Sequence, residues 1–79
     1  MTEQQRKKIL VETVQTFGQQ EWFRDATIYD VHPLTGQPTL EFKVNYVPVL
    51  RMKDVKEFVD RFQLTDKMVV VDKKGNPAE

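Results

Sequence analysis

Residues 39–46 read Thr-Leu-Glu-Phe-Lys-Val-Asn-Tyr, and this stretch decides the fold. Apolar side chains occupy every second position, a period of two that is typical of a β-strand with one buried face and one wet face. Pro48 follows, and proline cannot donate a hydrogen bond to a sheet. We therefore expect a strand over 39–47. Its core-facing side chains would be Leu40, Phe42, Val44 and Tyr46.

A second strand precedes this one along the chain. Residues 26–32 (Ala-Thr-Ile-Tyr-Asp-Val-His) have the β-branched and aromatic enrichment of a strand, and residues 33–36 (Pro-Leu-Thr-Gly) have the composition of a turn. The two strands should therefore form an antiparallel hairpin.

Two registers of this hairpin compete. One places Ile28 opposite Phe42. The other places Tyr29 opposite Phe42, which sets Asp30 directly against Glu41, a destabilising pair of like charges. We favour the first register for this reason.

An amino-terminal helix over 3–17 is predicted by a capping box formed by Thr2 and Gln5. Gly18 could end the helix in the left-handed conformation. The spacing i, i+4, i+7 predicts a buried stripe of Leu10, Val14 and Phe17, with Ile9 and Val11 on its flanks. In the connector that follows, we expect one aromatic side chain of the adjacent Trp22 and Phe23 to anchor the core.

A second helix over 52–63 and a third strand over 67–72 complete the predicted elements. The helical stripe consists of Met52, Val55, Phe58, Val59 and Phe62. The strand is an unbroken apolar run between charged residues. We expect the tail at 75–79 to fray.

The sequence thus predicts an α+β fold, a two-layer sandwich in the order α-β-β-α-β. A right-handed crossover through the second helix would make the third strand parallel to the second. The three-stranded mixed sheet would then carry both helices on one face. With 79 residues, the chain has room for a single small domain, 1–79.

Composition excludes several classes of protein and site. The chain is 39% hydrophobic and 30% charged, and its apolar runs are too short for a membrane span. It has no cysteine and one histidine, so neither a disulfide nor a structural zinc site is expected, and no cofactor motif is present. Lacking an apolar export signal as well, the protein is expected in the cytoplasm.

The balance of charge makes a nucleic-acid partner the alternative rather than the first choice. Twelve basic residues balance twelve acidic ones, and affinity for phosphate backbones comes largely from a basic face. Nucleic-acid binding would require the basic residues of both helices to converge. These residues are Arg6, Lys7, Lys8, Arg51, Lys53 and Lys56.

Asp30 and His32 are the best catalytic candidates in the sequence, because a carboxylate two positions away along a strand could orient the imidazole as a general base. Thr35, in the adjacent turn, is the nearby hydroxyl that the sequence offers as a nucleophile or substrate polariser. His32 more simply belongs to the turn at Pro33, so we expect no enzymatic activity.

The third strand provides the strongest indication of function. A two-layer fold leaves one sheet face open to water. An apolar strand on that face is expected to pair with a strand of another chain or to be covered by a partner protein. We therefore expect a protein–protein interaction or regulatory module that self-associates or binds another protein. The expected interface consists of Tyr29, Met68, Val69, Val70 and Val71.

Overall fold

The structure, a computed structural model, describes residues 1–78 and has the predicted α+β order. Its elements are α1 (Glu3–Phe17), β1 (Phe23–Tyr29), β2 (Thr39–Val44), the 3-10 turn η1 (Val49–Arg51), α2 (Met52–Arg61) and β3 (Thr65–Val70).

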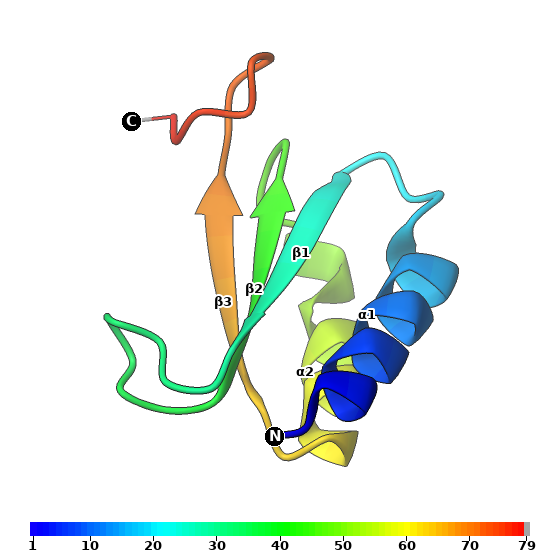
Figure 1. Cartoon of the computed structure of the whole chain (residues 1–79). Helices are drawn as coiled ribbons and strands as arrows, with labels where there is room; N and C mark the ends of the chain where they lie inside the picture. Colours follow the sequence, from blue (N-terminus) through cyan, green and yellow to red (C-terminus); the bar gives the residue numbers. More distant parts are fainter. Residues whose placement is uncertain (79) are drawn as a thin grey trace.

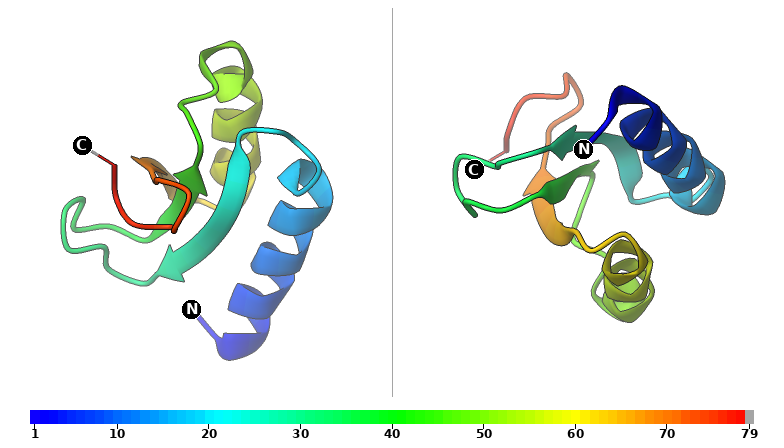
Figure 2. Two further views of the ribbon diagram at one scale, coloured as in Figure 1. Left: turned by 90° about the horizontal axis from the view of Figure 1, so that it is seen from above. Right: turned by 60° about the horizontal axis from the view of Figure 1, so that its bottom comes forward.

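The sheet has the strand order β1-β2-β3. β1 pairs antiparallel with β2, and β2 pairs parallel with β3, as a crossover through α2 requires. Both helices lie on the same face of the sheet, and within residues 1–78 no helix covers the opposite face (Figures 1 and 2). The fold is therefore a two-layer sandwich.

The hairpin has neither of the two registers considered from the sequence. Ile28 lies opposite Leu40, and Tyr29 lies opposite Thr39. This is a slip of two residues from the favoured register, so the side chains of the paired residues keep their expected faces. The predicted strand 26–32 lies at 23–29 because residues 30–38 form a folded loop.

The observed ends of β2 and β3 differ by a few residues from the predicted ones. β2 stops at Val44 instead of residue 47, and Tyr46 is about half exposed instead of facing the core. β3 begins at Thr65, because the Thr65 amide already donates to the carbonyl of Pro38 (2.9 Å). It ends at Val70.

The core lies between the sheet and the helices. Leu40, Phe42 and Val44 of β2 are completely buried. Phe42 packs edge-on against Phe17 of α1, with ring centroids 5.7 Å apart, and Trp22 packs beside both. Trp22 is thus the connector side chain that anchors the core.

The buried stripe of α1 is rotated from the predicted one. Ile9, Thr13 and Phe17 are buried, whereas Val11 and Val14 are about half exposed. Thr13 is accommodated because its hydroxyl donates to the carbonyl of Ile9 (2.7 Å), which satisfies the polar group inside the core. Spacing alone could not reveal this compensation.

The predicted cap at the start of α1 is confirmed, and the predicted conformation at its end is wrong. The capping box between Thr2 and Gln5 is present. Gly18 is right-handed (φ −62°), not left-handed. A Cβ atom on Gly18 would lie 2.3 Å from the carbonyl oxygen of Val14, so glycine is required there by close approach.

α2 ends at Arg61, two residues before the predicted end, in a Schellman motif. The amide of Leu64 donates to the carbonyl of Val59 (3.0 Å), and the amide of Gln63 donates to that of Asp60 (3.0 Å). Gln63 takes the left-handed position (φ 58°) that glycine usually fills. This motif turns the chain from α2 into β3.

Candidate functional site

The open face of the sheet, away from the helices, is mostly polar. Ile28, Phe42 and Val70 pack toward the helices, and alternation along each strand turns their neighbours to the other side. The open face therefore carries Thr27, Tyr29, Thr39, Glu41, Lys43, Thr65, Lys67 and Val69. The expected excess of apolar side chains is absent from this face, because the helices cover the apolar side of the sheet.

The side chains expected to form the interface do not share one surface. Tyr29 and Val69 lie on the open face, but on the two outer strands. Met68 and Val70 pack against the core from the helix side, and Val71 is buried. What Met68, Val69 and Val70 share is a strand at the edge of the sheet.

The outer edge of β3 presents unpaired backbone groups. The amides of Thr65 and Val71 donate to the carbonyls of Pro38 and Val44 in the adjacent chain (2.9 Å each). In a parallel ladder alternate residues bond to the same neighbour, so the odd-numbered residues of β3 face β2. The even-numbered ones, Asp66, Met68 and Val70, turn their amides and carbonyls outward, to the side of β3 where residues 1–78 provide no further strand (Figure 1).

The tail covers only the carboxyl end of this edge. The amide of Ala78 donates to the carbonyl of Val70 (2.8 Å), and Pro77 forms a bridge with Val71. Residues 75–78 are therefore hydrogen-bonded rather than frayed as expected, and residue 79 lies outside the described residues. Among the described residues, 1–78, no backbone group is bonded to the amide of Val70 or to the amides and carbonyls of Met68 and Asp66 on this side.

The opposite edge of the sheet, on β1, is irregular. The register shifts between Phe23 and Asp25, where the strand carries a bulge. The outward-facing amide of Ala26 is already occupied, because it donates to the carboxylate of Asp25 (2.8 Å). Bulges and local side-chain bonds of this kind protect sheet edges against strand pairing. β3 is therefore the edge better suited to accept another strand.

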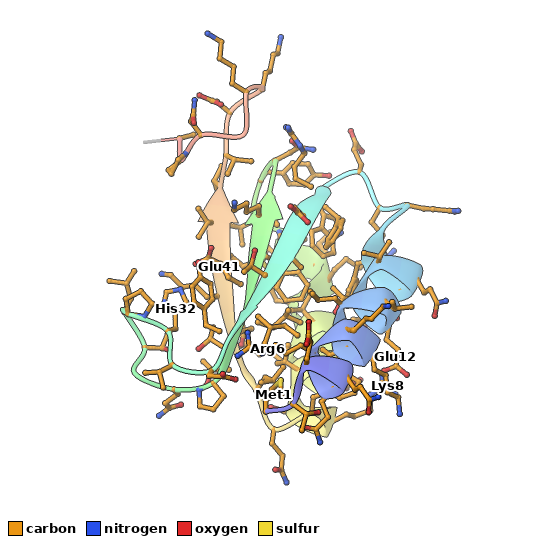
Figure 3. All side chains as sticks on the ribbon, viewed as in Figure 1. Met1, Arg6, Lys8, Glu12, His32 and Glu41 are labelled. Atoms are coloured by element: carbon orange, nitrogen blue, oxygen red, sulfur yellow. The ribbon has the colours of Figure 1, made fainter. Side chains whose placement is uncertain are left out.

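His32 and Glu41 form a buried pair on the open face, beneath the loop between β1 and β2 (Figure 3). Their Nε2 and Oε2 atoms are 2.6 Å apart. The second ring nitrogen, Nδ1, accepts from the amide of Leu34 (3.0 Å), and the ring of Tyr29 packs edge-on against the imidazole. Each nitrogen of the imidazole has a protein partner, so the pair closes the loop onto the sheet.

Asp30 and Thr35 do not join His32 in a catalytic arrangement. Asp30 lies at the surface, where it pairs with the guanidinium of Arg6 and faces the amino group of Met1 (3.8 Å). The hydroxyl of Thr35 bonds to that of Thr39 (2.7 Å). The carboxylate that contacts the imidazole is Glu41, nine residues further along the chain, which is too distant for a local motif to identify.

The basic residues considered for nucleic-acid binding do not converge. Residues 6–8 lie near the start of α1, whereas residues 51–56 lie at the start of α2, and these starts are at opposite ends of the helical layer (Figure 1). Arg6 is also paired with Asp30, and Arg51 lies 3.9 Å from Asp54. The geometry therefore provides no common basic face for these residues.

An exposed apolar loop lies between β2 and α2, where no surface feature was predicted from the sequence. Leu50 is 96% exposed and Val49 is 75% exposed. With Trp22, Tyr46, Val47 and Pro48 they border a shallow hollow of about 430 Å³. The available signal in the sequence is a run of apolar residues at 47–50 without a periodic pattern.

Within residues 1–78, no group of three or more His, Cys, Asp or Glu side chains is arranged to hold a metal ion. In the same residues no helix has the length and apolarity that crossing a membrane would require.

Comparisons with known proteins give no relative. No protein-family model matches the chain, and no curated protein or solved structure matches it. Functional inference therefore depends on the geometry of the edge, the buried pair and the exposed loop.

Proposed function

We propose that this protein is a non-enzymatic protein–protein interaction module that self-associates through the outer edge of β3. The observation that carries the proposal is the row of outward-facing backbone groups at Asp66, Met68 and Val70. An unpaired row of this kind is a template for another strand, and strand addition is a common mode of protein recognition.

The small size of the chain supports self-association. A domain of this length buries only about 60% of the surface that its unfolded chain exposes, so an additional interface contributes usefully to stability. β3 is a regular strand of 6 residues without proline or glycine. We place this function in the cytoplasm, in keeping with the absence of cysteine from the sequence.

The proposal is tested by light scattering after size exclusion on the wild-type chain and two proline variants. Met68→Pro removes an outward amide from β3 without removing a bond to β2. Ala26→Pro is the matched control, because it removes an outward amide from β1. Wild type and control should approach twice the 9.3 kDa of one chain at high concentration, whereas Met68→Pro should remain monomeric.

Two results would overturn the proposal. One is a wild-type chain that stays at 9.3 kDa. The other is a folded Met68→Pro variant that associates as strongly as the wild type, which would move the contact to another surface. Circular dichroism establishes that each variant is folded.

A further inference from the structure

We infer that β3 pairs with β3 of a second copy in an antiparallel, two-fold register that places Met68 opposite Met68. This inference rests on the proposed self-association and specifies its geometry. It follows from which backbone groups are free, from the charges along the strand and from the position of the tail.

The free groups restrict the pairing to a few registers. The outward-facing backbone amides and carbonyls of β3 belong to Asp66, Met68 and Val70. In a dimer these groups must form hydrogen bonds with the same set of groups in the second copy. Two-fold antiparallel pairing can then be centred on Asp66, Lys67, Met68 or Val69.

Repulsion between like charges disfavours two of these centres. Centring on Asp66 sets that carboxylate opposite its own copy, and centring on Lys67 sets two ammonium groups opposite each other. Like charges directly opposite one another destabilise a strand pair. Centring on Met68 instead places Lys67 opposite Val69 and Asp66 opposite Val70, which creates no pair of like charges.

The tail disfavours the remaining centre. Centring on Val69 moves the second strand toward the carboxyl end of β3, where the carbonyl of Val70 already accepts from Ala78 (2.8 Å). The Met68 register loses only the bonds from the Asp66 amides to the occupied Val70 carbonyls, and it keeps those in which the Val70 amide donates to the carbonyl of Asp66 in the second copy. The two Met68 residues would exchange amide and carbonyl bonds across the axis.

Side-chain size is compatible with this register. Directly opposed residues of a hydrogen-bonded antiparallel pair have Cα atoms about 5.5 Å apart. Met68 is half-buried, contacts the core from the helix side and carries no charge. A methionine pair across the axis would extend the apolar layer beneath the joined sheets, since unbranched thioether side chains adapt to irregular gaps.

Cysteine cross-linking tests the register directly, because the chain has no cysteine of its own. The variants are Asp66→Cys, Lys67→Cys, Met68→Cys and Val69→Cys, each oxidised under identical conditions. A Cα separation of about 5.5 Å suits a disulfide, so Met68→Cys should give the largest dimer fraction. Preferential cross-linking of any other variant would overturn the register while leaving self-pairing intact.

Amide exchange on the wild-type chain provides a test without substitutions. Raising the protein concentration should slow exchange at the amides of Met68 and Val70 at least tenfold. The amides of Lys67 and Val69, which face β2, serve as internal controls and should change little. If the chain sediments as a dimer but these exchange rates do not change with concentration, the register is wrong. If the rates do not change and the chain also stays monomeric, self-association itself is contradicted.

Discussion

The imidazole Nε2 of His32 lies 2.6 Å from Oε2 of Glu41, and both side chains are buried beneath the loop that joins β1 and β2. The pair connects a loop residue to the middle of β2. Since Leu34 donates to the other ring nitrogen, the imidazole holds both the loop and the strand. The contact therefore contributes to the shape of the open face.

Replacing His32 with alanine should lower the free energy of unfolding by about 2 to 3 kcal/mol, because it leaves the Glu41 carboxylate without its partner in a buried site. Glu41→Gln is the matched control, since its amide oxygen can still accept from Nε2–H, and it should cost about 1 kcal/mol or less. Urea denaturation measures both. Equal losses for the two variants would argue against this role of the pair.

The proton of a neutral His32 should reside on Nε2. Nδ1 accepts from the Leu34 amide (3.0 Å), so Nε2–H is the group that donates to Glu41. Nitrogen chemical shifts of the labelled imidazole distinguish the two tautomers. A spectrum showing protonated Nδ1 would mean that the Leu34 amide has a different acceptor.

Gln63→Gly should stabilise the protein by about 0.5 to 1 kcal/mol. Gln63 has a left-handed backbone (φ 58°) at the end of α2, and a residue with a Cβ atom pays a steric cost there that glycine avoids. Thermal and urea unfolding measure the change. Gln63→Ala, which keeps the Cβ atom, should not reproduce the gain, and a stabilised alanine variant would show that backbone strain is not the cause.

Truncation to alanine should destabilise the protein strongly at one leucine and hardly at all at another. Leu40 is completely buried in β2, so Leu40→Ala should cost about 2 to 5 kcal/mol. Leu50→Ala should change the unfolding free energy by less than about 0.5 kcal/mol, because the side chain is 96% exposed. Denaturation of the dilute monomer measures both values. A large loss for Leu50→Ala would mean that the loop packs more closely than its exposure indicates.

The elements that could be predicted from sequence are those with a local cause. The capping box at Thr2 fixes the start of α1, and the alternation at 39–44 identifies β2. The hairpin register could not be predicted, because it depends on how the loop folds. Within that loop the amide of His32 donates to the carbonyl of Gln37 (3.0 Å), a bond that a comparison of facing side chains on the two strands cannot include.

The candidate site was predicted only in part, for a related reason. The sequence pointed to a strand that lies at an edge of the sheet, since Met68 and Val70 belong to β3. It could not indicate that the backbone groups on which the proposal rests face outward, because a strand's position in the sheet depends on partners distant in the chain. The partner of His32 was missed for the same reason.

Sedimentation equilibrium over a concentration series tests the central claim most directly. For pairing along one short edge we expect a dissociation constant on the order of 100 μM or tighter, in the range of small transient interfaces. The weight-average mass should rise from 9.3 kDa toward twice that value as concentration passes this range. A mass that stays at 9.3 kDa up to millimolar concentration would contradict self-association through β3.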